Sequence, residues 1–358
     1  MIVTMRRFPH QGCQRRIKCI TSWEKIHKDQ HNITLRKKMS NRTTVTEFLL
    51  LGFSDVRELQ ILHFIVFLVI YLAALIGNLL IITVVVLDHH LHSPMYFFLM
   101  NLSILDLGSI SIIVPKSMAN SLMNTRSISY SGCVAQVFLF VFFVSADLVL
   151  LTVMAYDRYV AICQPLHYER VMNRRACVQM AAGVWIGVFL YAALHTGITF
   201  AVSFCGGNVV GQFFCEIPQL LQLAGSDLYL SETGTIAFSV CLGLSCFVFI
   251  IVSYVQIFKT VLRIPAEQRR HKAFLTCLPH LTVVSLFFCT ATFAYSHPTS
   301  SSASALDLVV AVLYSVLPAV MNPIIYSMRN KEIKAALRKL IGWRLFTRNN
   351  LTIFSLWL

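Results

Sequence analysis

Seven long runs of apolar residues, each nearly free of charge, dominate this chain of 358 residues. A helix needs about 20 apolar residues to cross a bilayer, and a backbone inside lipid must satisfy its own hydrogen bonds. The runs predict transmembrane helices over residues 59–87, 94–118, 133–163, 176–203, 231–262, 273–297 and 305–328. The fold class expected is therefore an all-α membrane protein, a bundle of seven transmembrane helices.

The composition agrees with a chain that has lipid as its solvent. Hydrophobic residues make up 56% of it and charged residues 13%, with a mean hydropathy of +0.68, whereas soluble domains are about 25% charged. The net charge of +14 would suit nucleic acid, but residues 1–38 alone contribute +8 of it. No basic domain interleaved with aromatic residues is present. Membrane lipids are thus expected as partners, and nucleic acid is not.

The loops carry Lys and Arg unequally, and this asymmetry predicts the orientation. Loops 204–230 and 298–304 contain neither residue, whereas segments 164–175 and 259–272 contain three and five. Positive residues concentrate on the cytoplasmic side of membrane proteins. We therefore expect a plasma-membrane protein with its N-terminus outside and its C-terminus in the cytoplasm.

The two ends of the chain are treated separately from the helices. We divide the chain into a basic extension at 1–38, an extracellular N-terminus at 39–58, a transmembrane domain at 59–328 and a cytoplasmic tail at 329–358. The extension violates the charge rule and lacks the apolar segment of a signal peptide. Met39 is followed by a glycosylation sequon at Asn41. We expect translation of the working protein to start at Met39, a glycan on Asn41, and a short amphipathic helix on the inner leaflet in the tail.

Motifs in a fixed order on these helices carry a family resemblance. They are GN at 77–78, LHSPMYFFL at 91–99, MAYDRYVAIC at 154–163, SY at 253–254, KAFLTCLPHL at 272–281 and NPIIYSMRNK at 322–331. One such motif would be weak, but the ordered set is specific. Over residues 39–341 the chain resembles the vertebrate olfactory receptors, a branch of the rhodopsin-like G-protein-coupled receptors.

The resemblance implies a receptor and not an enzyme. It implies that a small-molecule odorant activates nucleotide exchange on a heterotrimeric G protein of the stimulatory, olfactory type, which raises cAMP. The residues that match the family's switch are Asp157, Arg158, Tyr159, Tyr254, Asn322, Pro323 and Tyr326. Proline removes a backbone donor, so we expect Pro318 and Pro323 to kink the seventh helix, where a bistable element is needed.

The resemblance also implies a disulfide between Cys133 and Cys215. Cys133 precedes Arg158 by 25 residues, about 37 Å along a helix, so the two lie at opposite membrane faces. The oxidising exterior permits the bond. A second loop cysteine, Cys205, lacks the usual partner, since Gly225 stands at that position. A second loop disulfide is therefore in doubt.

Two acidic residues are expected deep in the bundle. Asp147 precedes Arg158 by eleven residues, about 16 Å along the same helix face, and Asp106 lies at a similar depth in the second helix. Two carboxylates this close do not both stay ionised without a counter-charge, so we expect them to share a proton or a sodium ion. Asn78 and Asn322 would complete this network, and no other cofactor is expected. The alternative is plain hydrogen bonding between helices.

The family binds odorants among the outer halves of helices three, five, six and seven. The inward positions expected here are Phe140, Val141, Val144, Ser145, Phe238, Leu242, Phe288, Thr292, Tyr295 and Val312. Phe140 stands where amine receptors carry an Asp, and most of the set is apolar, so a small hydrophobic, volatile ligand is expected. Ser145, Thr292 and Tyr295 are the candidate donors, with ordinary helix packing as an equal alternative for each.

Other functional classes are weaker but open. A transporter or channel needs a polar pathway, and an intramembrane enzyme needs a nucleophile with a base; Asp106 and Asp147 alone make neither. A receptor that does not signal is a further alternative. Gly225, Pro279 and Phe288 depart from the family pattern, and Pro279 lies at the hinge expected to open for the G protein.

Overall fold

The structure is a computed structural model. It describes residues 45–54, 56–123, 125–201, 204, 207–223, 229–263, 267–296, 305–329 and 331–347. The predictions for residues 1–38, Met39 and Asn41 lie outside the described residues, as do those for Cys205 and Gly225.

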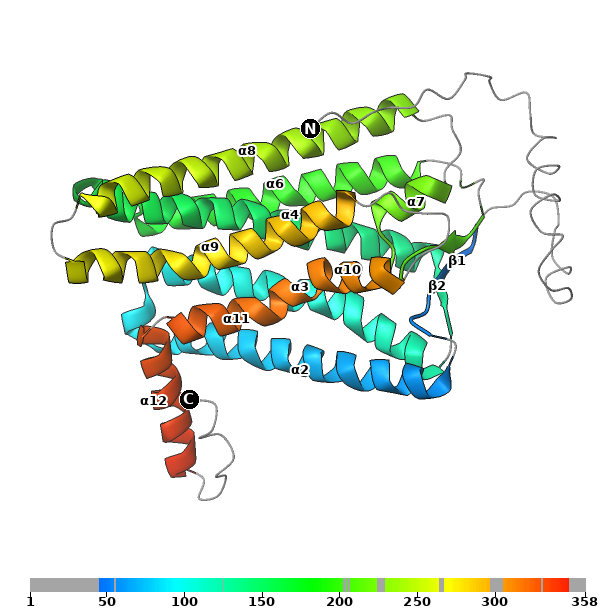
Figure 1. Cartoon of the computed structure of the whole chain (residues 1–358), viewed down its shortest axis with the longest axis horizontal. Helices are drawn as coiled ribbons and strands as arrows, with labels where there is room; N and C mark the ends of the chain where they lie inside the picture. Colours follow the sequence, from blue (N-terminus) through cyan, green and yellow to red (C-terminus); the bar gives the residue numbers. More distant parts are fainter. Residues whose placement is uncertain are drawn as a thin grey trace, which may run out of the picture.

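Long helices lie side by side along the longest axis of the molecule (Figure 1). They are α2 (Arg57–Leu87), α3 (Pro94–Met123), α4 (Tyr130–Cys163), α6 (Arg174–Phe200), α8 (Tyr229–Leu262), α9 (Glu267–Ser296), and the consecutive pair α10 (Ala305–Ser315) and α11 (Leu317–Arg329). Shorter helices are η1 (His89–Leu91), η2 (Pro165–His167), α5 (Tyr168–Val171), α7 (Ile217–Leu223) and α12 (Lys331–Thr347). These helices occupy the seven predicted segments, so the predicted helical bundle is confirmed.

The long helices have the composition of membrane spans. Among the described residues, six are long and apolar enough to cross a bilayer. They are α2, α3, α4, α6, the part Ala237–Leu262 of α8, and the stretch Leu308–Tyr326 across α10 and α11. Helix α9 is 30 residues long, but its described apolar stretch is only His280–Cys289. Outward-facing side chains such as Val69 and Leu190 are more than half exposed, as expected for a lipid-facing surface.

Several observed boundaries depart from the predicted ones: α3 ends five residues later, at Met123, and two further departures lie in α9 and the seventh span. Helix α9 begins at Glu267, six residues before the predicted start. The polar residues that precede its apolar part include good helix formers, so the helix extends over them. The seventh span is broken at Val316 between α10 and α11. Pro318 has no N–H to bond the carbonyl of Tyr314. The kink predicted for this helix is therefore present as a break.

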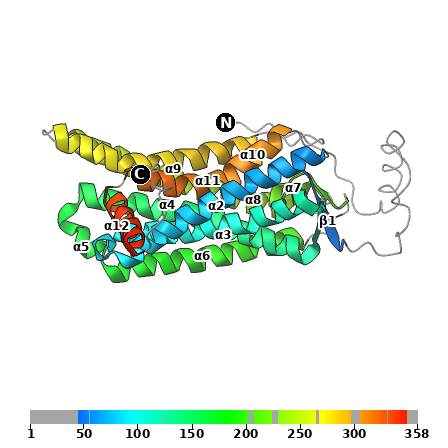
Figure 2. The same ribbon diagram turned by 90° about the horizontal axis from the view of Figure 1, so that it is seen from below.

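A small sheet closes one end of the bundle, where β1, β2 and α7 lie together (Figures 1 and 2). Its strands are β1 (Glu47–Leu50), β2 (Ser127–Ser129) and β3 (Val209–Val210), in the order β2-β1-β3. Strand β1 is antiparallel to β2 and parallel to β3. Phe48 and Leu50 of β1 are buried against Cys133, Val137 and Cys215. The N-terminal segment thus joins two loops in one outer cap.

Two glycines allow helices to approach closely within the bundle. A Cβ atom on Gly108 of α3 would lie 2.3 Å from the ring of Phe143 on α4. A Cβ atom on Gly77 of α2 would lie 3.0 Å from Cγ of Pro323 on α11. Larger side chains at these positions would push the helices apart, which is why glycine precedes Asn78 at this crossing.

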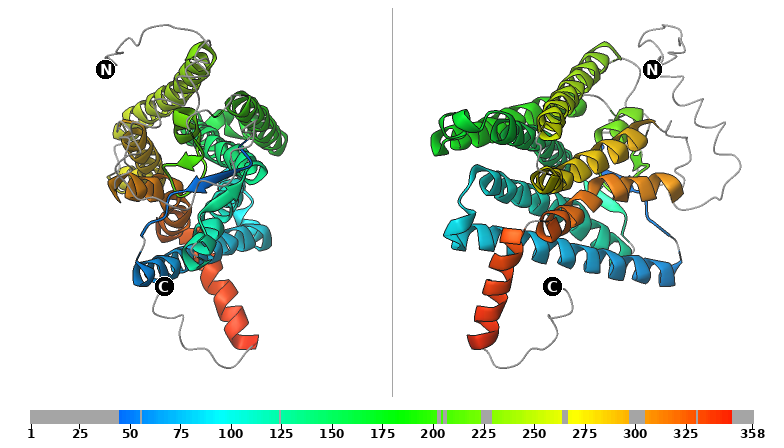
Figure 3. Two further views of the ribbon diagram at one scale, coloured as in Figure 1. Left: turned by 90° about the vertical axis from the view of Figure 1, so that its right-hand side faces the viewer. Right: turned by 60° about the vertical axis from the view of Figure 1, so that its left-hand side comes forward.

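Helix α12 leaves the bundle at the end opposite the sheet and projects away from the spans (Figure 3). Its Ile333, Ala336 and Leu337 are buried, whereas its Lys339 side chain is 77% exposed. The hydroxyl of Tyr96 donates to Oε2 of Glu332 at 2.5 Å, which fixes the start of α12 to α3. This is the amphipathic helix expected in the tail, and it continues to Thr347.

Candidate functional site

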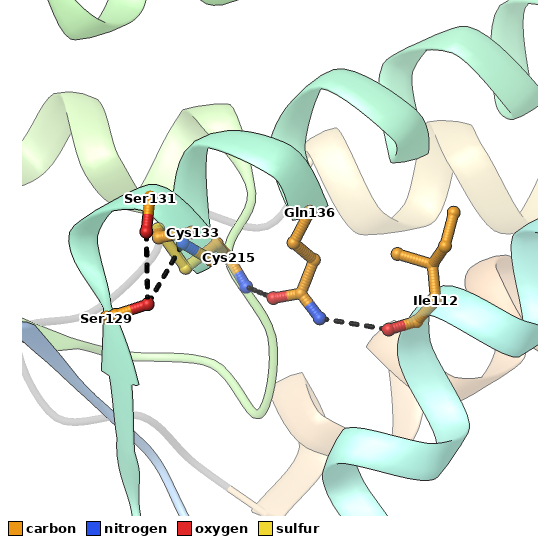
Figure 4. The surroundings of a disulfide bond; sticks show 7 residues. Ile112, Ser129, Ser131, Cys133, Gln136 and Cys215 are labelled. Atoms are coloured by element: carbon orange, nitrogen blue, oxygen red, sulfur yellow. Dashed lines mark hydrogen bonds between the residues drawn. A yellow bond between two sulfur atoms is a disulfide. The ribbon is translucent and has the colours of Figure 1, made fainter.

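The outer loop between α6 and α8 is bound to the top of α4 (Figure 4). Cys133 and Cys215 form the disulfide that the resemblance implies, with Cα atoms 5.6 Å apart. The backbone N–H of Cys215 donates to Oε1 of Gln136 at 2.8 Å, and Nε2 of Gln136 donates to the carbonyl of Ile112 at 3.2 Å. Gln136 therefore bonds the loop to α3 as well as α4.

Aromatic side chains of this loop pack onto the predicted ligand-binding region. The ring centroid of Phe214 lies 5.0 Å from that of Phe140 and 6.4 Å from that of Tyr314. Two further predicted residues, Val144 and Val312, pack against the same buried cluster. Its other buried members include Ile113, Phe213, Leu308 and Ala311. The structure thus brings Phe140, Val144 and Val312 together beneath the outer loop.

The other predicted pocket residues are more scattered. Val141 and Ser145 are partly buried on α4, and the ring of Phe288 lies 4.6 Å from that of Phe247. Phe238 and Leu242 on α8 are 54% and 39% exposed, and neither belongs to the cluster around Phe140. Thr292 and Tyr295 lie on α9, but their side chains are outside the described residues. All seven stay predictions for ligand contact.

One polar pair in this region was not predicted from the sequence. Glu216 is buried, and its carboxylate accepts a hydrogen bond from the hydroxyl of Tyr314 on α10. Burial raises the pKa of the Glu216 carboxyl to about 7, because the cost of desolvating the charged form exceeds the effect of the Tyr314 hydrogen bond. The signal that could have indicated it is an acidic residue directly after the disulfide cysteine, in a loop without Lys or Arg.

Two of the residues of the predicted polar network, Asn322 and Asp106, are in contact in the middle of the bundle. Nδ2 of Asn322 donates to Oδ1 and Oδ2 of Asp106 at 3.2 and 2.9 Å. Nδ2 of Asn78 donates to the carbonyls of Ala74 and Ala319, at 3.0 and 2.9 Å. These bonds connect α11 to α3 and to α2.

Asp147 is buried near this network and feels the like charge of Asp106. Its Oδ1 atom has no hydrogen-bond partner among the described residues. The structure thus joins Asn322 to Asp106 and places Asp147 near them, whereas the printed bonds of Asn78 go to backbone carbonyls. The shared proton or sodium ion stays a prediction.

The predicted switch residues Asp157, Arg158 and Tyr159 lie in the last two turns of α4, at the end of the bundle opposite the sheet. The hydroxyl of Tyr168 on α5 donates to Oδ1 of Asp157 at 2.8 Å. Desolvation, followed by the nearby Asp157 charge, raises the pKa of the Tyr168 hydroxyl. Nη2 of Arg158 donates to Sδ of Met95 at 2.6 Å. The hydroxyl of Tyr159 accepts a hydrogen bond from Gln164 at 3.3 Å.

A buried histidine holds one switch tyrosine in place. His280 Nε2 lies 3.0 Å from the carbonyl oxygen of Leu151, and Nδ1 lies 2.8 Å from the hydroxyl of Tyr254. A carbonyl only accepts, so Nε2 carries the proton and Nδ1 accepts from Tyr254. Tyr326 is buried, and its hydroxyl has no hydrogen-bond partner among the described residues. The charge of Arg158 acts on both tyrosines. His280 lies in the 272–281 motif, but no sequence pattern indicated this role.

The comparisons with known proteins decide the family. The family model described as olfactory receptor matches residues 67–343. This chain belongs to the olfactory receptor family. Two human relatives support the assignment: olfactory receptor 14I1 is 56% identical over 310 residues, 87% of this chain and 98% of the relative, and olfactory receptor 14A16 is 54% identical over 307 residues, 86% and 99%.

A solved structure with the same architecture is the crystal structure of squid rhodopsin. It superimposes on this olfactory receptor with a TM-score of 0.65 and 16% identity, covering 82% of this chain and 83% of that one. The likeness confirms the fold of a seven-helix, rhodopsin-like receptor. As a member of the olfactory receptor family, the protein is a multi-pass membrane receptor, and the enzyme alternative is set aside.

Proposed function

We propose that this olfactory receptor binds a small, mostly hydrophobic odorant in the outer half of its bundle and activates a stimulatory, olfactory-type G protein, which raises cAMP. The proposed pocket lies beneath the disulfide-anchored loop, around Phe140, Val144 and Val312. Apolar pockets with few polar groups suit such ligands. The N-terminus would then be extracellular and α12 cytoplasmic, which places the disulfide in the oxidising exterior.

The observation that carries the proposal is the contact of Arg158. Its guanidinium donates to the thioether of Met95, at 2.6 Å. A thioether is a weak acceptor, so this contact can be exchanged for a stronger one at little cost. Tyr254 and Tyr326 are within electrostatic reach of Arg158. We read this as a resting arrangement in which Arg158 is ready to move towards the tyrosines and a G protein.

An odorant shifts such an equilibrium only by binding one conformation better than the other. In the resting arrangement Tyr254 is bonded to His280. In the active one we expect Tyr254 to leave His280 and meet Arg158. A sodium ion held by Asp106 and Asp147, with Asn322 beside them, would favour the resting arrangement, because it offsets part of the buried negative charge.

A cAMP reporter assay tests this function. Cells would express the chain begun at Met39 and receive a panel of volatile, hydrophobic odorants, with surface display verified by an antibody. A dose-dependent rise in cAMP, weakened by the pocket variant Phe140→Ala, is expected. Display at the surface without any response would favour the alternative of a receptor that does not signal.

A further inference from the structure

The outer loop reaches from the third span to the seventh. On one side the disulfide and Gln136 hold Cys215 against α4 and α3. On the other side the next residue, Glu216, accepts a hydrogen bond from Tyr314 of α10. The disulfide is covalent, whereas the Glu216 contact can be made and broken. The loop is thus attached covalently to α4 and reversibly to α10.

Tyr314 occupies a special place in the seventh span. It lies in the last turn of α10, two residues before the break at Val316. Pro318 lacks the N–H that would have bonded the Tyr314 carbonyl within a continuous helix. Below the break, Asn322 of α11 holds Asp106. A movement of the Tyr314 side chain therefore moves α10, the outer half of the span, next to the break at Val316.

The surroundings make the bond between Glu216 and Tyr314 important for both partners. The Tyr314 ring packs against a buried cluster made up of Ile113, Phe140, Phe213, Phe214, Leu308 and Ala311, all apolar. Glu216 is itself buried, and a buried carboxyl that loses its hydrogen-bond partner is strongly disfavoured. If the upper half of the seventh span moved away, Glu216 would have to follow it or become exposed to water. The loop and α10 are expected to move together.

We propose that the Tyr314–Glu216 hydrogen bond is a latch that couples the outer loop to the break in the seventh span. With the bond formed, the loop covers the aromatic cluster and α10 is held in place. With the bond broken, the segment after Glu216 and the upper half of the seventh span are both released. This goes beyond the proposed function, since it holds with no odorant or G protein bound.

Hydrogen exchange measured by mass spectrometry tests the latch on purified full-length receptor in detergent, without odorant. The peptides to follow cover α7, directly after Glu216, and α10. Tyr314→Phe removes only the hydroxyl and keeps the ring, so the fold is expected to persist. We expect about tenfold faster exchange in both peptides. Glu216→Ala should give the same result, whereas Glu216→Gln, which still accepts a hydrogen bond, should exchange close to the wild-type rate.

The matched control is Tyr191→Phe, whose hydroxyl donates to Ser239 at 2.9 Å between α6 and α8. It should leave the α7 and α10 peptides unchanged. The double variant Tyr314→Phe with Glu216→Ala should exchange no faster than either single variant, because both remove one interaction. Unchanged α7 exchange in Tyr314→Phe would overturn the latch, and so would additive effects. A receptor that shows this exchange pattern but never signals would contradict the proposed function alone.

Discussion

The side-chain amide of Asn322 donates to both carboxylate oxygens of Asp106, at 3.2 and 2.9 Å. This contact joins the lower half of the broken seventh span to α3. Asp147, close enough to repel Asp106, keeps one buried oxygen without a partner among the described residues. A sodium ion would satisfy that oxygen and reduce the repulsion between the two carboxylates.

The acidic pair predicts a stabilising effect of sodium. Purified receptor should melt at a higher temperature in sodium chloride than in choline chloride of equal ionic strength, by about 2 °C or more, because an ion that binds the folded state stabilises it. Asp147→Asn should abolish the difference by removing one of the two charges. Equal melting temperatures in the two salts would leave the hydrogen-bonded network without a sodium site.

The close crossing of α2 and α11 predicts a strongly destabilising substitution. A Cβ on Gly77 would already lie 3.0 Å from Pro323, so Gly77→Leu should lower the free energy of unfolding by about 1–3 kcal/mol. The matched control is Gly187→Leu on α6, where nothing lies within 4 Å of the added Cβ. Thermal melting of both variants measures the effect. Similar melting temperatures for the two would show that the crossing is looser than described.

The loop disulfide should be essential for a stable outer end. Cys133→Ser is expected to cost about 2–5 kcal/mol of stability and to reduce surface display, measured by an extracellular antibody. Cys215→Ser should do the same, and the double variant should be no worse than either. Cys241→Ser, which changes a free and exposed cysteine, is the control. Normal display of both single disulfide variants would contradict the structural role.

Docking of the outer loop should depend on pH through Glu216. Its pKa is about 7 when docked, against an ordinary value of 4.5, so the docked loop binds more protons. Protonation of Glu216 therefore favours the docked loop most at pH values below the ordinary pKa of 4.5. This contribution to docking is lost as the pH rises through about 7. Among the described residues, the Tyr314 hydroxyl on α10 is a titratable group that donates a hydrogen bond to Glu216.

The measurement is hydrogen exchange of α7 at about pH 5.5 and about pH 7.5, corrected for the intrinsic pH dependence of exchange. Corrected exchange should be slower at the lower pH in the wild type and independent of pH in Glu216→Gln. A pH effect that persists in Glu216→Gln would assign it to a different group.

Most of the helices of the bundle could be predicted from the sequence, because the length of an apolar segment shows whether it can cross a bilayer. The third and fifth spans were predicted to within three residues at each end. The disulfide was implied by family resemblance and is present. The contact of Glu216 with Tyr314, 98 residues apart, depends on how the loop folds over the bundle. No local pattern encodes that.

Two further features lay beyond sequence patterns for similar reasons. The strands of the outer cap have two to four residues each, too few for alternation to be recognised. The exposure of Phe238 follows from the rotation of α8 about its own axis, and an almost wholly apolar helix carries little information on which face points inward.

The central claim is that Arg158 is the switch through which a bound odorant acts on a G protein. The most direct test is the cAMP response of Arg158→Ala beside Arg174→Ala, an exposed arginine at the start of α6, with equal surface display of both. The account predicts that Arg158→Ala reduces the odorant response by about tenfold or more, while Arg174→Ala responds like the wild type. A full response from Arg158→Ala would contradict it.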